Sequence, residues 1–213
     1  MLHVVHHPDY AVAVPDGTHR FSKYGAVMDV LRAGGDLIEH RPEPMPRAWL
    51  TAAHDAAYVD AVSAAAVDPA IERRIGFPIT PAVARRAVLS VGGTWLAACL
   101  ALDHGYAANA AGGSHHADAS SGAGYCVFND IVVAAYRLLA EGRRARIAIV
   151  DCDVHQGDGT AELLEPDPEA FTLSVQCERN YPFTRIPSDL DVELPAGTGD
   201  TAYLTALTAA LAE

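Results

Sequence analysis

Short apolar runs alternate with longer, helix-like stretches along most of the chain. Runs rich in β-branched residues predict strands, and apolar residues recurring every three or four positions predict helices. Such alternation predicts an α/β fold in which a mainly parallel sheet is flanked by helices. The expected strands cover residues 2–5, 37–40, 106–111, 147–151 and 171–176, and the expected helices cover 23–33, 55–66, 81–102, 130–141, 160–164 and 201–212.

The chain shows no internal repeat and has a length typical of one domain, so residues 1–213 are expected to form a single unit. Two segments rich in proline and glycine, 41–46 and 187–199, are predicted to be surface loops. In a parallel sheet, ligands bind beyond the carboxyl ends of the strands. Two polar clusters and Ser174 are expected at those ends.

The first cluster is the run Asp151-Cys152-Asp153-Val154-His155-Gln156-Gly157-Asp158-Gly159, directly after an apolar strand. If strand geometry continues, Asp151, Asp153 and His155 share one face, while Cys152 and Val154 point into the packing. Neighbouring carboxylates need a compensating cation, and these oxygen and nitrogen ligands suit zinc or ferrous iron. The alternative is turn chemistry, with the first two aspartates capping a helix that starts near residue 160.

The second cluster is Gly112-Gly113-Ser114-His115-His116. Adjacent histidines in a regular strand would point to opposite faces. The glycines permit a sharp turn with positive φ, which would present both imidazoles to one cavity. The alternative is one core histidine beside one surface histidine.

Composition narrows the function classes. The formal charge of −12 disfavours binding to nucleic acid or anionic membranes and would attract basic peptides or polyamines. The apolar stretch 81–102 carries Arg85 and Arg86 and is expected to be a packed helix, not a membrane span. The amino terminus lacks a signal-peptide pattern, and the four cysteines form no Cys-x-x-Cys pair. We therefore expect a cytoplasmic protein with reduced, mostly buried thiols.

The motifs at 112–117, 124–130 and 151–160 together resemble the metal-dependent histone deacetylase superfamily, which has an arginase-like α/β fold. Weaker motifs at 19–24 and 75–78 resemble bacterial members close to the class IV branch. The resemblance covers essentially the whole chain. It implies a hydrolase that releases an acetyl or other acyl group from an acetylated lysine peptide or an acetylpolyamine.

The resemblance also implies roles for individual residues. Asp153 and His155 match metal ligands for Zn²⁺ or Fe²⁺, and His115 and His116 match the tandem histidines that handle protons. Asp151 matches the partner of the first histidine and, with Ser174, a structural K⁺ site; Asp158 matches the partner of the second. Substrate contacts are expected from the Gly124 carbonyl and from Tyr125 and Phe183 as tunnel walls.

The implied mechanism is amide hydrolysis by metal-activated water, with His116 and Asp158 as the general base. The family's third metal ligand and its oxyanion-stabilising tyrosine lie later than Glu213, so the resemblance predicts an incomplete, C-terminally truncated domain. The alternatives are an incomplete fragment of an active enzyme, a metal- or ligand-binding module without turnover, or a site completed by another subunit. An arginase-type ureohydrolase fits the Asp-Val-His-Gln-Gly-Asp run poorly. The oligomeric state is left open.

Overall fold

The computed structural model describes residues 1–14 and 21–213 of the chain. Strands and helices alternate, as the sequence predicts. The strands are β1 (Leu2–Val5), β2 (Leu37–His40), β3 (Ala108–Asn109), β4 (Ile147–Asp151), β5 (Ala170–Cys177) and β6 (Leu190–Leu194). The helices are a 3-10 turn η1 (Pro8–Tyr10), α1 (Lys23–Gly34), α2 (Arg47–Ala53), α3 (Ala56–Ser63), α4 (Pro69–Ile75), α5 (Pro81–His104), α6 (Asp130–Ala140), α7 (Asp158–Leu164) and α8 (Asp200–Ala210).

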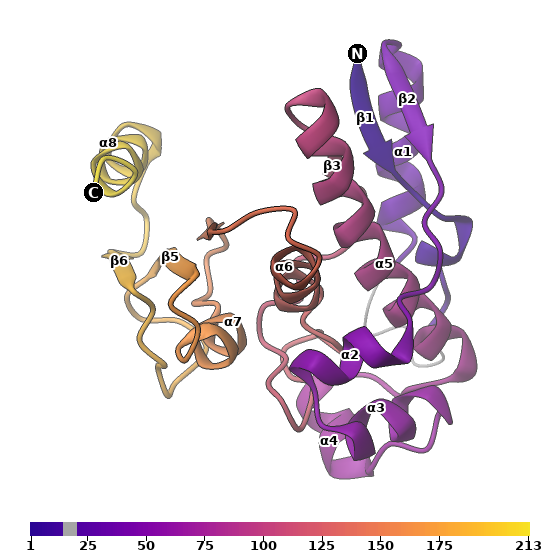
Figure 1. The fold of residues 1–213 in the computed structure, drawn as a ribbon. Helices are drawn as coiled ribbons and strands as arrows, with labels where there is room; N and C mark the ends of the chain where they lie inside the picture. The colour runs from indigo at the N-terminus through magenta and orange to yellow at the C-terminus, as the bar shows by residue number, and fades with distance from the viewer. Residues whose placement is uncertain (15–20) are drawn as a thin grey trace.

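The strands pair in parallel, which confirms the predicted α/β class. In the described part of the chain they form two sheets of three strands each, in the orders β2-β1-β3 and β4-β5-β6, and Figure 1 shows these two sheets on opposite sides of α6. In the second sheet, Asp151 of β4 pairs in register with Ser174 of β5. Because all strands run the same way within a sheet, the loops at their carboxyl ends gather along one edge of each sheet.

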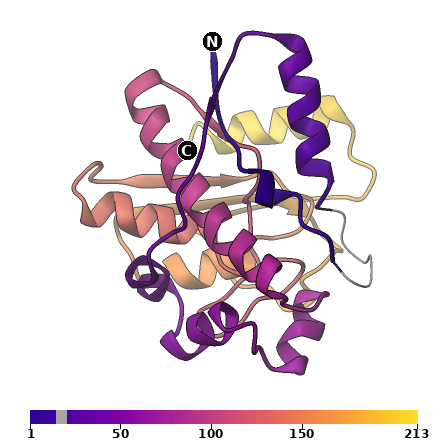
Figure 2. The ribbon, with the colours of Figure 1, turned by 90° about the vertical axis from the view of Figure 1, so that its right-hand side faces the viewer.

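Helix α5 is the central packing element, and Figure 2 shows it crossing the molecule diagonally. Thr80 caps its first turn by accepting a hydrogen bond from the Val83 amide, and Pro81 occupies the first turn, where its missing N–H costs nothing. Gly92 is required by packing, since a Cβ there would lie 1.9 Å from the Glu43 carbonyl oxygen. The helix is long and apolar enough to cross a membrane by length and composition, and in this fold it packs against α6 and β1.

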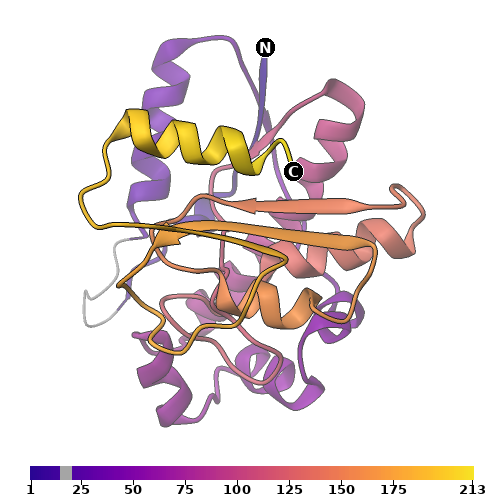
Figure 3. The same ribbon diagram turned by 90° about the vertical axis from the view of Figure 1, so that its left-hand side faces the viewer.

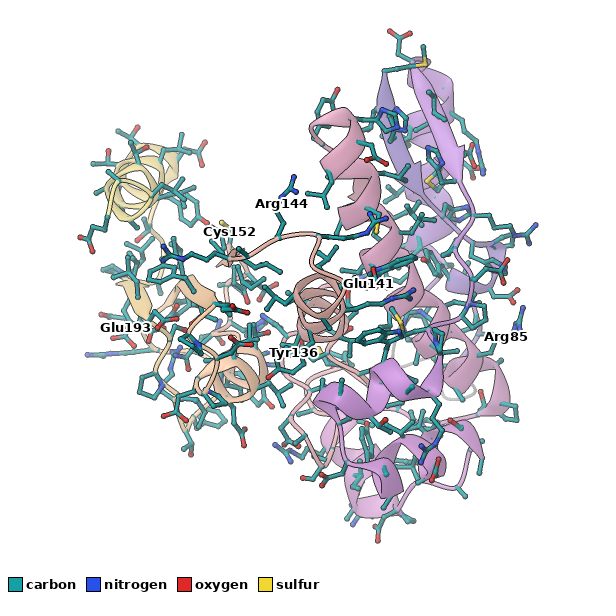
Figure 4. The ribbon with its side chains drawn as sticks, viewed as in Figure 1. Arg85, Tyr136, Glu141, Arg144, Cys152 and Glu193 are labelled. Atoms are coloured by element: carbon teal, nitrogen blue, oxygen red, sulfur yellow. The ribbon has the colours of Figure 1, made fainter. Side chains whose placement is uncertain are left out.

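The main core lies where α5 and α6 meet the shorter helices. Its fully buried members include Phe128, Val132 and Val133. Tyr136 extends from α6 toward α7, where its hydroxyl donates to the Leu163 carbonyl (Figure 4). A smaller cluster at Leu173 and Val175 is covered by α8, which runs beside the strands of the second sheet in Figure 3.

Several predicted boundaries were wrong. Segment 187–199 is not all loop, because residues 190–194 form β6. Strand β5 continues to Cys177, so Ser174 lies inside the strand and not at its end. The strand expected over 106–111 is reduced to two residues. Helices α2 and α4 were not predicted, although Asp68 caps α4 just before Pro69.

Candidate active site

The two adjacent histidines follow a glycine turn, and the buried carboxylate of Asp130 holds this turn in place through hydrogen bonds. Gly112 and Gly113 have φ values of 103° and 77°, in the left-handed region that glycine adopts without strain. The fully buried Asp130 accepts hydrogen bonds from the amides of Gly113 at 3.2 Å and Ser114 at 2.8 Å, and from the Thr94 hydroxyl. A Cβ on Gly112 would lie 2.4 Å from the Asp130 carboxylate. Glycine is therefore required where the chain bends back toward α6.

Both histidines bind a carboxylate through the same ring atom. Nδ1 of His115 lies 2.6 Å from Oδ2 of Asp151, and Nδ1 of His116 lies 2.6 Å from Oδ1 of Asp158. The rings are only 6% and 3% exposed, and their centroids are 4.0 Å apart. The turn thus places both imidazoles on one cavity. In the alternative reading, one histidine would be in the core and one on the surface, and this is wrong.

Charge around His115 shifts its protonation equilibrium. Burial alone would lower the pKa of His115, but the hydrogen bond and negative charge of Asp151, with the charges of Asp153 and Asp158, outweigh it and raise the pKa. Burial also acts on Asp153 and would raise its pKa, but the His155 amide and the His115 and His155 imidazoles favour the carboxylate and lower it. The carboxylates around His115 therefore favour its protonated form, and the groups around Asp153 favour its ionised form.

The predicted ligands Asp153 and His155 lie in a turn, not in an extension of β4. The strand ends at Asp151, whose Oδ1 accepts from the Asp153 amide at 2.9 Å, and Asp153 in turn accepts from the His155 amide at 2.8 Å. These are turns in which an aspartate binds the backbone two residues ahead. Cys152 and Val154 are exposed, so the prediction that they point into packing was wrong.

Asp153 and His155 nevertheless bring two donor atoms together. Nδ1 of His155 lies 2.8 Å from Oδ1 of Asp153, and both side chains are partly exposed to the cavity. Oxygen and imidazole nitrogen are donors that zinc and ferrous iron accept. Catalytic zinc sites have three protein ligands. Over residues 1–14 and 21–213, no third histidine, cysteine, aspartate or glutamate joins them to form such a group, so the donors fit the metal in type and supply part of its ligand set.

Ser174 fits a different kind of ion. Its hydroxyl is 2% exposed and has no hydrogen-bond partner within the described parts of the chain. It stands opposite Asp151 across the β4–β5 ladder. A buried hydroxyl without a partner is unfavourable, and a monovalent cation such as K⁺ would satisfy its oxygen.

The histidines face a cavity of about 700 Å³. Gly124 and Tyr125, the predicted substrate contacts, both line it. Their amides donate to the carbonyls of Arg74 at 3.1 Å and Ile75 at 2.7 Å, which ties this loop to the end of α4. The Gly124 carbonyl accepts from the Cys126 thiol at 3.6 Å. Of the expected 19–24 motif, His19 and Arg20 lie outside the described residues.

Phe183 is not a wall of this cavity. Its side chain is 94% exposed and it is absent from the lining. Tyr181, two residues earlier, lines the cavity and packs edge-on against His116 with ring centroids 4.8 Å apart. The wall assignment was therefore wrong by two positions. Sequence reasoning also missed Asp130, although it directly follows Asn129, whose side chain caps α6.

Comparison with known proteins shows which family and fold the chain resembles. A model of the histone deacetylase domain matches residues 17–213. An uncharacterized protein of Picosynechococcus is 43% identical over 209 residues, which cover 96% of this chain and 69% of the relative. Histone deacetylase 2 of Arabidopsis thaliana is 40% identical over 124 residues, 57% of this chain but only 32% of the relative. The solved acetylpolyamine aminohydrolase of Burkholderia pseudomallei shares the fold, with a TM-score of 0.78 at 20% identity, covering 100% of this chain and 78% of that one.

Proposed function

The chain belongs to the histone deacetylase family, and from that premise we propose that it contributes a zinc- or iron-dependent deacetylase site. The reaction would hydrolyse the amide between an acyl group, normally acetyl, and the amine of a lysine side chain or a polyamine. One observation carries the proposal: His115 and His116 are each bonded to a carboxylate and share one cavity with Asp153 and His155. Paired acid-base groups beside metal donors suit metal-assisted hydrolysis.

The His116–Asp158 pair is suited to act as the base. A carboxylate that accepts from Nδ1–H holds the imidazole in the tautomer whose Nε2 carries the lone pair. Nε2 is then the atom that takes a proton from water and later returns it to the leaving amine. His115, with a raised pKa and Asp151 beside it, would hold positive charge near the developing oxyanion. When held by Asp153 and His155, the metal would supply polarisation of the acyl carbonyl and a more acidic water.

Other residues are suited to hold the substrate. Tyr125 and Tyr181 line the cavity and offer aromatic surface to the aliphatic stem of an acyl-lysine. The carbonyl of Gly124 would accept a hydrogen bond from the substrate amide. Asp151 and Ser174 would hold K⁺ behind the site, which would stabilise the first histidine pair.

A second candidate is a binding module of the same fold that retains ligand without turnover. The short donor set favours this candidate, because no third donor joins Asp153 and His155 within the described segments. The two candidates differ in whether the histidine pair turns over a substrate.

The test is amide hydrolysis by the purified chain after equilibration with zinc. An acetyl-lysine peptide is supplied and the free amine is measured, together with zinc per protein by elemental analysis. We expect turnover that falls by about 10²- to 10⁴-fold in His116→Ala, with zinc still bound. His104→Ala, which removes an exposed imidazole outside the cavity, is the matched control. Unchanged turnover in His116→Ala would reject the assigned base, and retained zinc without turnover would favour the binding module.

A further inference from the structure

The cavity is basic although the protein is acidic. The whole chain has 27 acidic residues and 15 lysines and arginines. Among the lining residues that the structure describes, within 1–14 and 21–213, the balance is reversed: the only carboxylate is Asp153, and the cations are Lys23, Arg73, Arg74 and Arg86. Lys23 is also the one lysine in the sequence. The charge at this opening is therefore opposite to that of the surrounding protein.

Two of these cations already have partners. Arg74 forms an ion pair with Asp118 at 3.0 Å and binds the Ser121 hydroxyl. Arg86 is buried, donates to the Tyr10 carbonyl at 3.2 Å, and stacks on the Phe21 ring at 4.0 Å. Both side chains are therefore held in place by the protein itself.

Lys23 and Arg73 differ from that pair. Both are exposed, Lys23 at the first residue of α1 and Arg73 in the last turn of α4. Within residues 1–14 and 21–213, neither forms an ion pair with a carboxylate. The Lys23 ammonium lies over the ring of Tyr24, 5.2 Å from the ring centre, and both residues line the cavity. These two cations are available to an incoming substrate.

Local charge decides what enters a cavity at physiological salt. The Debye length is then about 8 Å, so carboxylates elsewhere on the surface are largely screened while the charges at the opening are not. An anionic group beside the acylated amine would gain from Lys23 and Arg73. A cationic group there would be repelled, and of the lining residues that the structure describes only Asp153 is a carboxylate that could compensate it.

We propose that this cavity selects an acyl-lysine flanked by carboxylates, as in an acidic peptide segment, over an acetylpolyamine or a basic peptide. The inference rests on the proposed deacetylase function and adds the charge of the substrate. It separates this chain from its structural neighbour, whose name specifies a polyamine substrate. Lys23 and Arg73 are the specificity residues.

The test uses three fluorescent peptides of equal length with a central acetyl-lysine, flanked by glutamate, glutamine or lysine. Binding is measured by fluorescence anisotropy, and hydrolysis is measured in parallel. We expect the glutamate peptide to bind about tenfold more tightly than the lysine peptide at low salt, with the difference shrinking at high salt. Equal binding, tighter binding of the lysine peptide, or no binding of any peptide would overturn the proposal.

Charge-reversal variants locate the effect. Lys23→Glu and Arg73→Glu should each reduce the preference several-fold, and together they should reverse it. Arg144→Glu changes the net charge equally at an exposed residue in the loop before β4, labelled in Figure 4, and should leave the preference unchanged. An effect of Arg144→Glu as large as that of Arg73→Glu would show that net charge, not the cavity, is responsible. Charge-dependent binding without hydrolysis of any peptide would contradict the deacetylase proposal and leave the charge selectivity standing.

Discussion

Nδ1 of His116 lies 2.6 Å from Oδ1 of Asp158, the first residue of α7, and the imidazole is 3% exposed. The pair joins the glycine turn to the helix that follows Asp153 and His155. Gly159 permits this approach, since a Cβ there would lie 2.4 Å from the Ala117 carbonyl oxygen. The histidine is therefore oriented from both its ring and its backbone side.

Asp158→Asn tests this orientation. The amide keeps the size of the side chain but can donate to Nδ1, which would stabilise the wrong tautomer. We expect the turnover number for acetyl-lysine hydrolysis to fall by about 10²- to 10⁴-fold with little change in thermal stability. Asp167→Asn, outside the cavity, is the control. Activity within twofold of the unmodified protein would mean that Asp158 does not set the tautomer.

Tyr181 and Phe183 provide a matched pair of aromatic substitutions. Tyr181→Ala removes a cavity wall that contacts His116, so we expect KM for an acetyl-lysine peptide to rise about tenfold. Phe183→Ala removes a ring that is 94% exposed, so it should leave KM and, within about 0.5 kcal/mol, stability unchanged. Steady-state kinetics on both variants shows which of the two rings forms the cavity wall. A larger effect of Phe183→Ala would restore the original assignment of the wall.

Asp130→Ala should destabilise the fold. It would leave the Gly113 and Ser114 amides and the Thr94 hydroxyl without their acceptor, and a buried polar group left unpaired costs about 1–3 kcal/mol. We expect the free energy of unfolding, measured by urea denaturation, to fall by about 2–4 kcal/mol. The control is Asp200→Ala. Asp200 is the exposed first residue of α8, so this variant removes a charge from a helix terminus without leaving buried groups unpaired. Equal losses in the two variants would show that Asp130 acts only through the helix dipole.

The four thiols should react in an order set by exposure. Cys152 is exposed at the end of β4 (Figure 4), whereas burial raises the pKa of Cys126 to about 12. Because the thiolate is the nucleophile, iodoacetamide should alkylate the exposed Cys152 while the buried Cys126 remains an unreactive thiol. Peptide mapping by mass spectrometry after iodoacetamide treatment measures both rates. Alkylation of Cys126 in the folded protein as fast as that of Cys152 would contradict the buried placement.

The sequence predicted the elements whose patterns are local. Strands β1, β2 and β4 and helix α5 show clear apolar runs or helical periodicity, and the structure confirms them. β6 was missed because the prolines and glycines around it suggested a loop, although Leu190, Val192 and Leu194 alternate with acidic residues as a strand does. Helix α4 was missed despite its Asp-Pro start.

In the site, too, the features set by local sequence were predicted and the features set by distant contacts were not. The glycine turn predicts convergence of His115 and His116, because glycine backbone freedom is a local property. The choice between Tyr181 and Phe183 depends on how the loop after β5 folds over the cavity, which neighbouring residues alone do not determine. Cys152 and Val154 were misplaced for a related reason, since Asp151 and Asp153 bind the backbone two residues ahead and end the strand early.

The backbone bonds from Gly124 and Tyr125 to the end of α4 have a consequence for how such a site can diversify. Arg74 supplies a carbonyl to that loop and a guanidinium to Asp118, which follows the histidine pair by two residues. The loop that lines the cavity opening and the histidine pair are therefore connected to each other through hydrogen bonds and an ion pair of Arg74. Replacing α4 with the corresponding helix of a relative would change the cavity opening and would also displace the imidazoles. We therefore expect specificity to change more readily through single side-chain substitutions than through exchange of whole segments.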